Sequence, residues 1–372
     1  MPSTSPPLTS ERRPVTIYDV AAALGMHKST VSLALSGKGN VSKETRARVQ
    51  EVATQLGYSP NPLAQRLARA SSNSLVALCS GGLDVGLGTE KILLIQKLLS
   101  GRGLESPIYT LSDWFNDSSA STDNGSQKTR LAVAQATQMR SVCRQHPRAI
   151  VCAAPALSAS VWNELAHYTE KGGLVVTYDV SVPFNCDQVV FDREDNAFQG
   201  ARALIEAGHT EIGFAMPVSA HWPSDDPHLP QNQRIAGWKR ALAEAGLRWR
   251  DEWMFVHRPY ETGGAQLAEK FLALNPRPTA LCIVNDYAAL AFMVEVMRAG
   301  VRVPEDVSLV GHDDQAVARY CPVPLSSVSQ PAEEIATNVF DLLSSRLEGE
   351  SAPPRRVEVR GKFVQRESIA PR

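Results

Sequence analysis

Residues 15–58 read VTIYDVAAALGMHKSTVSLALSGKGNVSKETRARVQEVATQLGY, and the pattern of this stretch indicates the structure of the N-terminal part of the chain. From Ile17 to Leu24 the apolar residues recur at positions i, i+3, i+4 and i+7, which is the spacing of an amphipathic helix. Thr16 is a suitable N-cap and Gly25 a suitable C-terminal stop. The sequence therefore predicts a short helix between these two residues.

A second and a third helix are predicted directly after the first. Val31, Ala34 and Leu35 form the apolar side of the second helix, and the opposite side is short and polar. Ser42 can cap the third helix, which Gly57 ends. Two short helices with a tight glycine turn, closed by a third helix, describe a helix-turn-helix unit. The alternative is a small three-helix cap with a solvated outer face.

The charge of the chain is unevenly distributed. The 372 residues carry a net charge of −1, yet residues 1–70 hold nine Lys and Arg against four Asp and Glu. A basic head on an acidic body indicates that the head alone meets a polyanion. With 43% apolar and 21% charged residues the composition is globular, and the length predicts two or three domains.

Neither a membrane span nor a secretory signal is predicted. No apolar run reaches the ~18 residues of a membrane helix, and residues 1–14 are predicted to be a disordered leader rich in Pro, Ser and Thr. The cysteines are scattered, so we expect no disulfide, no metal site, no cofactor and a cytoplasmic location. These cysteines are Cys79, Cys143, Cys152, Cys186, Cys282 and Cys321.

Residues 73–372 alternate between short apolar strands and helices, as doubly wound parallel sheets require. About 300 residues are too many for one such sheet, so we predict an α/β body with two lobes. Ligands in such folds bind beyond the carboxyl ends of the strands. The expected strands are 75–79, 108–111, 149–153, 174–178, 211–215, 280–284 and 308–311, and the expected helices are 90–100, 127–145, 159–171, 195–207, 232–245, 263–273, 286–299 and 332–347.

The chain resembles the lac repressor family (LacI/GalR regulators), densely in the head and more loosely in the body. The resemblance implies an all-α helix-turn-helix head at 15–58, a hinge helix at 59–72, and a two-lobed periplasmic-binding-protein-like body for effector binding and dimerisation at 73–372. By composition alone the hinge would be a simple linker. The resemblance rests on residues 15–25, 29–32, 41–46, 56–67, 195–200, 207–213, 234–238, 284–286, 303–314, 326–331 and 366–368.

The resemblance also implies which residues contact DNA. In the family the second helix reads operator bases, here through Lys28, Ser29 and Leu33, while Leu67 corresponds to a leucine wedged into the minor groove. His27 replaces the usual capping Ser, and Leu33 replaces the polar reader of many members, so we expect an operator preference unlike that of lac repressor. The expected DNA contacts are Thr16, Tyr18, Lys28, Ser29, Thr30, Ser32, Leu33, Lys38, Thr45, Arg46, Asn61, Ala64, Gln65 and Leu67.

Polar residues stand at the ends of several predicted strands. Asp179, Asn285 and Asp313 each follow such a strand, and Arg234 opens a helix after a long loop. Carboxylates, an amide and a guanidinium suit hydroxyl-rich ligands because each makes paired hydrogen bonds. The matching positions line the effector site of the family. The alternative roles are strand-end capping and ion pairing, and Asp286 is expected to be a helix N-cap.

Aromatic residues near these positions have different expected roles. Trp222, in the loop before Arg234, could stack on a sugar face and is taken as an effector residue, although an exposed loop aromatic is the more common case. Trp238 is expected to pack in the core. His312 stands where the family usually has an aromatic ring.

The combined prediction is a sequence-specific DNA-binding transcriptional regulator, expected to be a repressor. A small molecule, by default a sugar, would bind between the lobes and change the affinity of a homodimer for a pseudo-palindromic operator. The alternative is a solute-binding protein without a role on DNA. An enzyme is not expected, because no nucleophile elbow, phosphate loop, zinc-protease motif or dinucleotide fingerprint is present. The adjacent Asp313 and Asp314 would point in opposite directions and make a poor acid–base pair.

Overall fold

The computed structural model describes residues 15–36, 41–58, 74–81, 83, 86–111, 124–153, 157–217 and 227–372. The chain divides into two compact units, residues 1–73 and 74–372. The predicted leader at 1–14 and hinge at 59–72 lie outside the described residues.

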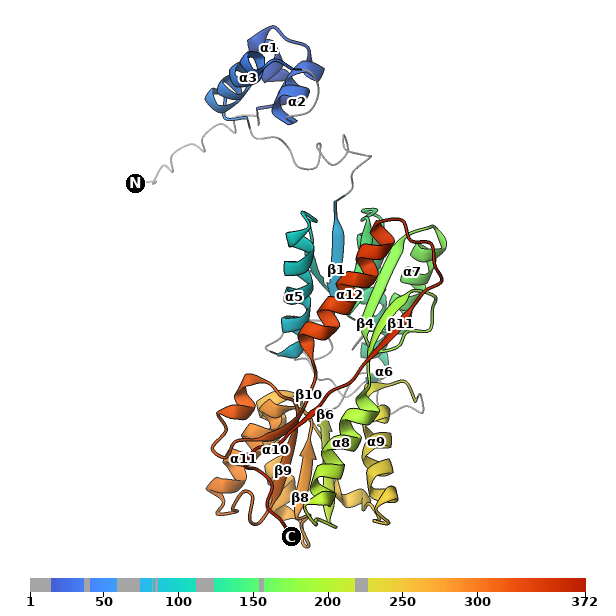
Figure 1. Ribbon diagram of the computed structural model, residues 1–372, viewed down its shortest axis with the longest axis vertical. Coiled ribbons are helices and arrows are strands. Elements are labelled where there is room, and N and C mark those ends of the chain that lie inside the picture. The colour runs from blue at the N-terminus through green and yellow to red at the C-terminus, as the bar shows by residue number, and fades with distance from the viewer. Residues whose placement is uncertain are drawn as a thin grey trace, which may run out of the picture. The chain divides into compact units, whose positions relative to one another are not determined.

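The head consists of α1 (Ile17–Leu24), α2 (Lys28–Ser36) and α3 (Lys43–Gln55), as the apolar spacing predicts (Figure 1). The Asp19 carboxylate accepts hydrogen bonds of 2.7 Å from both the backbone N–H and the hydroxyl of Thr16, which closes the start of α1. Gly25 ends α1 in the left-handed conformation, with φ of 61°. The three helices share a small buried core of Val20, Ala21, Val31, Ala34, Val49 and Ala53.

The body contains two six-stranded sheets, one in each lobe, as the strand and helix alternation predicts (Figure 1). In lobe 1 all neighbouring strands are parallel, and in lobe 2 only the last strand runs antiparallel to its neighbour. Lobe 1 has the order β11 (Arg356–Val359), β5 (Asp187–Phe191), β4 (Leu174–Asp179), β3 (Ala149–Ala153), β1 (Val76–Ser80), β2 (Ile108–Thr110). Lobe 2 has the order β12 (Phe363–Val364), β10 (Ser326–Ser329), β9 (Ser308–Asp313), β8 (Ala280–Ile283), β6 (Ile212–Pro217), β7 (Met254–His257).

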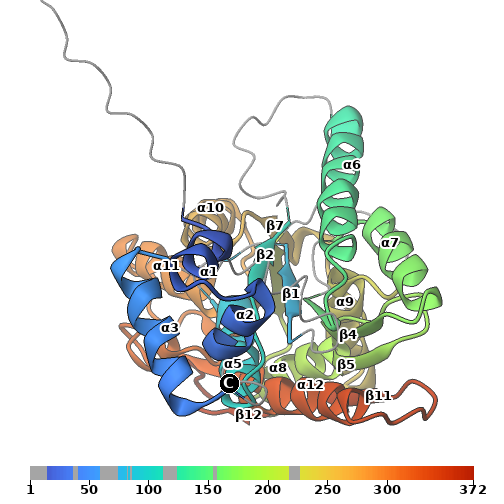
Figure 2. The ribbon, with the colours of Figure 1, turned by 90° about the horizontal axis from the view of Figure 1, so that it is seen from above.

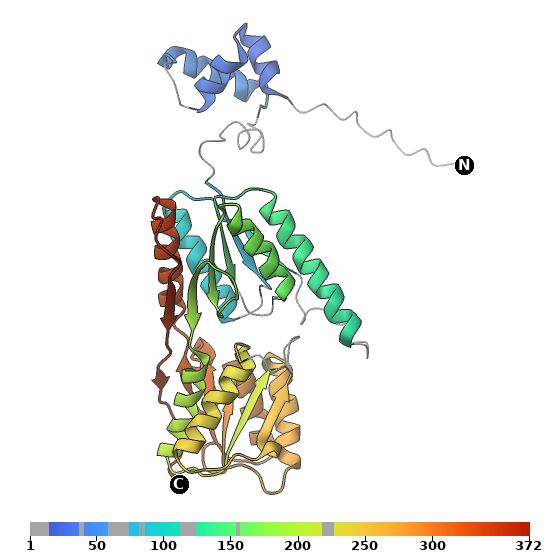
Figure 3. The same cartoon turned by 90° about the vertical axis from the view of Figure 1, so that its right-hand side faces the viewer.

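Helices cover both faces of each sheet, so every central strand is buried on two sides. In lobe 1, α5 (Leu87–Gly101) and α12 (Ala332–Leu347) cover one face, and α6 (Asn124–Cys143) and α7 (Ala159–Glu170) cover the other (Figures 2 and 3). In lobe 2, α8 (Arg193–Glu206) and α9 (Pro230–Glu244) share one core, while α10 (Tyr260–Ala273) and α11 (Asp286–Arg298) share the other. Trp238 lies fully buried and stacks on Phe214, as expected for a core residue. Short 3-10 turns at Asp251–Trp253 and Ala316–Arg319 complete the body.

Within the described residues the chain passes between the lobes three times, after β5, after β10 and after β11. The crossing segments are bonded to one another: Asn196 Nδ2 donates to the Ser329 carbonyl oxygen at 3.2 Å, and Gln199 Nε2 donates to that of Gly361 at 3.0 Å. A Cβ at Gly361 would lie 1.9 Å from the Ser329 oxygen, so this approach requires glycine. Three adjacent crossings form a compact hinge between two rigid lobes.

Candidate functional sites

The outer side of α2 is exposed, as the sequence predicts. Its inward residues Val31 and Ala34 are buried in the head core, which leaves the side chains of Lys28, Ser29 and Ser32 in solvent. Leu33 is 42% exposed, a large value for an apolar side chain. A short helix with small polar side chains on its free side can enter a major groove and reach base edges.

Residues of α1 and α3 flank this side of α2. Lys28 Nζ donates to Tyr18 Oη at 3.2 Å and lies 4.8 Å from the centre of the Tyr18 ring. This contact holds a cation and a 63% exposed phenol together at the start of α2. At the start of α3, the Thr45 and Ser42 hydroxyls lie 2.8 Å apart. Arg46 Nε is buried and has no hydrogen-bond partner in the described residues.

His27 takes over the capping role at the start of α2. The His27 Nδ1 lies 2.8 Å from Ser29 Oγ and also accepts from the Ser29 backbone N–H at 3.5 Å. The His27 carbonyl oxygen accepts from the Thr30 backbone at 3.0 Å. His27 therefore caps α2 in place of the usual Ser. Its ring also holds the hydroxyl of Ser29, a predicted base-reading residue. Thr30, another expected DNA contact on α2, is half-buried.

Six predicted site residues lie outside the described residues, and the structure therefore does not test them. Five of them are expected DNA contacts, four of which lie in the predicted hinge. The sixth is the aromatic residue that is expected to contact the effector. These residues are Lys38, Asn61, Ala64, Gln65, Leu67 and Trp222.

A cluster of charged side chains lies where the carboxyl end of β4 meets α5 and α8. Lys91 Nζ, from α5, forms an ion pair with Asp179 Oδ1, and both side chains are almost fully buried. Gln330 Nε2, from the second crossing, donates to the same Asp179 oxygen at 3.1 Å. Arg193, the first residue of α8, donates through Nη1 to the Asp179 backbone oxygen. Asp179 thus joins lobe 1 to two of the crossing segments.

Asp313 and Arg234 belong to the same cluster from the side of lobe 2. Burial raises the pKa of the Asp313 carboxyl, and the nearby charges of Arg234, Lys91 and Arg193 oppose this shift. Burial, followed by repulsion from Arg193, lowers the pKa of the Arg234 guanidinium to about 10. Burial likewise lowers the pKa of the Lys91 ammonium. Loss of water is the largest influence on each group, so an additional charge would act here with little screening.

Both strand-end aspartates have unusual backbone conformations. Asp179 has φ of 81° and Asp313 has φ of 102°, in the left-handed region that non-glycine residues rarely adopt. Asp314, the next residue, has φ of 50° and pairs with Arg366 at 2.6 Å. Local strain of this kind concentrates at functional sites. The structure therefore brings three of the predicted effector residues, Asp179, Arg234 and Asp313, into one electrostatic cluster.

The role of Asp286 differs from the prediction, whereas the effector role predicted for Asn285 is not tested. Asn285 Oδ1 accepts from the Ala288 backbone N–H at 3.2 Å and caps α11. Asp286 is fully buried and accepts from Ser327 Oγ and from the Gln315 backbone N–H, both at 2.7 Å. The prediction that Asp286 is the N-cap was wrong. One residue earlier, Asn285 has the extended backbone that a cap requires.

Three residues of the cluster, Lys91, Arg193 and Gln330, were not predicted. Lys91 carried a recognisable signal, since it precedes Ile92 and continues the buried side of α5 through Ile95. A lysine on a buried helix stripe needs a buried partner. Arg193 and Gln330 gave no comparable signal, because their positions depend on how the crossing segments pack.

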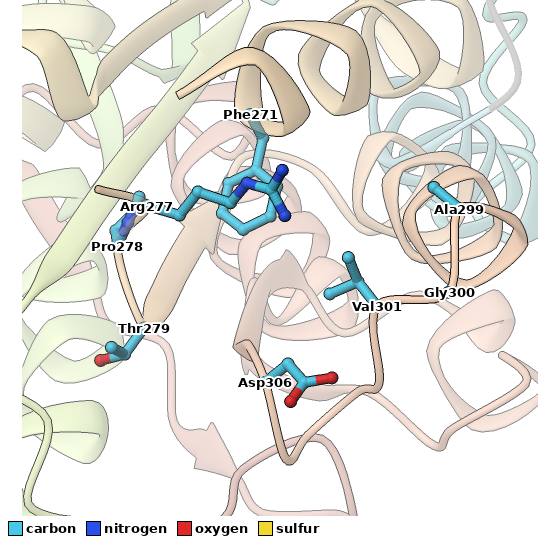
Figure 4. Close-up of a pocket in the computed structure, with 8 residues that line it drawn as sticks. All are labelled: Phe271, Arg277, Pro278, Thr279, Ala299, Gly300, Val301 and Asp306. Carbon is cyan, nitrogen blue, oxygen red and sulfur yellow. The ribbon is translucent and has the colours of Figure 1, made fainter. Parts of the chain in front are cut away.

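A separate surface pocket lies near the amino ends of the central strands β8 and β9 of lobe 2 (Figure 4). It has a volume of about 390 Å³, and its wall includes Thr279, which directly precedes β8, and the Ala299–Gly300 turn after α11. Arg277 donates to the Leu272 carbonyl oxygen at 2.7 Å, and Asp306 pairs with Arg302. Its charged groups thus serve neighbouring turns, and the pocket lies away from the strand ends where ligands bind in this architecture.

Metal and membrane features are absent from the described part of the chain. There, no three His, Cys, Asp or Glu side chains form a group that could hold a metal ion. No helix among those residues is long and apolar enough to span a bilayer.

Known proteins resemble both parts of the chain. Residues 16–61 match the model of bacterial regulatory proteins of the lacI family, and residues 201–369 match a periplasmic binding protein-like domain. The transcriptional repressor PurR of Vibrio cholerae is 26% identical over 95% of this chain and 98% of its own length. The transcriptional regulator AscG of Escherichia coli is 28% identical with the same coverage.

Solved structures support the same fold. The lac repressor dimer bound to operator and the anti-inducer ONPF has a TM-score of 0.77 at 22% identity, over 96% of this chain and 100% of that one. The regulator CelR in complex with cellobiose has a TM-score of 0.65 at 25% identity, with the same coverage. A solute-binding protein without a role on DNA would not account for the match of the head. The chain thus belongs to the lacI family of bacterial regulatory proteins and is a DNA-binding transcriptional regulator with an effector-binding body.

Proposed function

We propose that this protein is a homodimeric repressor whose operator affinity is set by a small molecule bound at the charge cluster of Lys91, Asp179, Arg193, Arg234 and Asp313. The observation that carries the proposal is the origin of these side chains. Two come from lobe 1 and three from lobe 2, and the crossing segments run beside them. A molecule bound there contacts both lobes and stabilises one arrangement of them over the other.

We propose a dimer because a single head makes few contacts with operator bases. One head offers only the few exposed residues of α2 for base contacts, and two heads on a palindrome double them. Leu67 is proposed to enter the minor groove between the two half-sites, with Asn61, Ala64 and Gln65 beside it. Lys28 and Leu33 are proposed to read bases, while Lys38 and Arg46 meet phosphates.

A sugar is the default effector class. The solved relatives include CelR with cellobiose and a regulator from Enterococcus faecium with bound ribose. Hydroxyl-rich molecules suit Asp313, Arg234 and the amide nitrogen of Asn285, and Trp222 is proposed to stack on the ring. A protein with this activity works beside DNA, in the cytoplasm.

The test is a selection of random duplex DNA by the purified full-length protein, with sequencing of the bound fraction. The proposal predicts enrichment of a pseudo-palindrome whose half-sites lie about one helical turn apart. A parallel selection with pooled sugars and purines shows whether the effector releases or recruits the operator. Absence of enrichment in both selections would contradict the proposal.

A further inference from the structure

The described residues of the charge cluster carry more positive than negative charge. Lys91, Arg193 and Arg234 are cations, whereas Asp179 and Asp313 are the carboxylates that couple to them. Lys91 and Asp179 are in direct contact, and the Asp179 carboxylate favours the charged form of Lys91. Among the described residues, one positive charge of the cluster has no opposite charge.

Other nearby carboxylates are engaged elsewhere. Asp286 faces Ser327 and the Gln315 backbone, burial raises its pKa well above the ordinary value, and the carboxylates Asp313 and Asp314 raise it further. Asp314 forms its own ion pair with Arg366 at 2.6 Å. Neither is among the carboxylates that couple to the three cations, so the surplus persists within the described residues.

Buried polar atoms of the cluster, and one on the same helix as Arg234, lack hydrogen-bond partners in the described residues. Arg193 is 4% exposed, and its Nε has no acceptor although its Nη1 is bonded to the Asp179 backbone. Arg234 Nε also has no acceptor, and Gln231 Oε1, one turn earlier on α9, has no donor. Buried donors and acceptors of this kind are costly when unpaired. An oxyanion would accept hydrogen bonds from the two guanidinium donors, and a hydroxyl would donate to the amide oxygen.

We propose that the effector is a hydroxylated monocarboxylate, such as a sugar acid, whose carboxylate lies against Arg193 and Arg234. The planar fork of a guanidinium matches a carboxylate with two parallel hydrogen bonds. A single negative charge equals the surplus in the cluster, whereas a phosphate ester would bring about two. A hydroxyl donates to Gln231. This inference rests on the proposed function and specifies the chemistry of its ligand.

The experiment compares matched ligands on the full-length protein. One arm holds gluconate, glucuronate and galacturonate, the second holds glucose, galactose and galacturonamide, and the third holds glucose 6-phosphate. Each compound is assayed by the shift in Tm and by its effect on binding of the selected operator. At least one acid should bind about tenfold or more tightly than its neutral counterpart, as expected for a hydrogen-bonded charge pair.

Two arginine variants on the same helix localise the effect. Arg234→Gln should remove the preference for the acid, because it removes the surplus charge and one guanidinium. Arg240→Gln is the matched control, since Arg240 lies on α9 but is 42% exposed and paired with Glu194 on the surface. The control should retain the acid preference. The acid–amide comparison on the unaltered protein stands even if Arg234→Gln fails to fold.

The outcomes separate this inference from the proposed function. If a neutral sugar or a purine shifts Tm and operator binding while no acid does, the monocarboxylate is wrong and small-molecule control stands. If glucose 6-phosphate binds more tightly than every acid, the single negative charge is wrong. If no compound changes either readout while the operator is bound, small-molecule control through this cluster fails, and the inference fails with it.

Discussion

His312 is a buried imidazole that contributes to the acid sensitivity of the body. Its ring is 1% exposed, Nδ1 lies 3.4 Å from the Ile283 carbonyl oxygen, and Nε2 is buried without a partner in the described residues. Burial, reinforced by the charge of Arg234, lowers its pKa to about 3. The folded protein therefore keeps this ring neutral, while the unfolded chain takes up a proton below about pH 6.5.

The size of the effect follows from proton linkage. Because the folded pKa is depressed, the unfolded state binds more protons between about pH 6.5 and 3, and stability falls as the pH falls through that window. Each pH unit contributes about 1.4 kcal/mol, so the loss at pH 5 is about 2 kcal/mol relative to pH 7.5. Replacement by Phe removes the titrating group and fits beside Phe214, which the ring meets edge-on. At pH 7.5 we expect a change below about 1.5 kcal/mol.

The assay is urea unfolding of His312→Phe and the unaltered protein at pH 7.5, 6.5, 5.5 and 5.0. Tryptophan fluorescence reports on lobe 2, where Trp238 and Trp253 are buried. Burial also lowers the pKa of His209 and His257, but both proteins share these groups. The free-energy difference should move by about 2 kcal/mol in favour of the variant from pH 7.5 to 5.0. A free-energy difference that stays constant with pH would contradict the assignment of this acid sensitivity to His312.

Three further perturbations test the packing and the two sites. Lys91→Met leaves Asp179 buried without its cation and should destabilise the body by about 3–5 kcal/mol in urea unfolding. The double variant Lys91→Met with Asp179→Leu should recover most of the lost stability. Equal losses of stability in the two variants would contradict the ion pair. Lys28→Ala should weaken binding to the selected operator by about 1–3 kcal/mol with less effect on random DNA, as measured by fluorescence anisotropy, and a uniform loss would assign Lys28 to phosphate. Gly237→Ala places a Cβ 1.9 Å from the Glu194 carbonyl oxygen and should lower Tm through a loss of about 1–3 kcal/mol; an unchanged Tm would mean that α8 and α9 separate freely.

The head could be predicted almost completely from its sequence. Helix periodicity, the Thr16 and Ser42 caps and the Gly25 stop are local signals, and the structure has helices at the expected places. In the body all expected strands and helices are present, with ends shifted by a few residues. Continuous apolar runs such as Ala149–Ala153 need no tertiary context to be recognised as buried strands.

Strands β5, β7, β10, β11 and β12 were not predicted, and the last three show where local signals end. β10 reads Ser-Ser-Val-Ser, and Ser326 and Ser327 are nonetheless fully buried. The Ser327 hydroxyl donates to Asp286, and the Ser326 backbone N–H donates to the Ser368 hydroxyl. β11 and β12 are short edge strands of four and two residues. Their pairing depends on chain crossings distant in sequence, which no local pattern encodes.

The candidate effector site was predicted in part for the same reason. Asp179 and Asp313 stand at strand ends, and the sheet architecture brings strand ends together. Arg193 and Gln330 lie on crossing segments, so their approach to Asp179 depends on the hinge between lobes. Asn285 and Asp286 are adjacent, and backbone geometry alone decides which of them caps α11.

The most direct test of the account measures operator affinity with and without effector for the unaltered protein and for Asp313→Ala. The selected operator is the probe, and the effector is the compound with the largest Tm shift in the ligand comparison. For Asp313→Ala we expect operator affinity within about threefold of the unaltered protein and no response to the effector. An intact response in Asp313→Ala would contradict the claim that this buried charge cluster controls DNA binding.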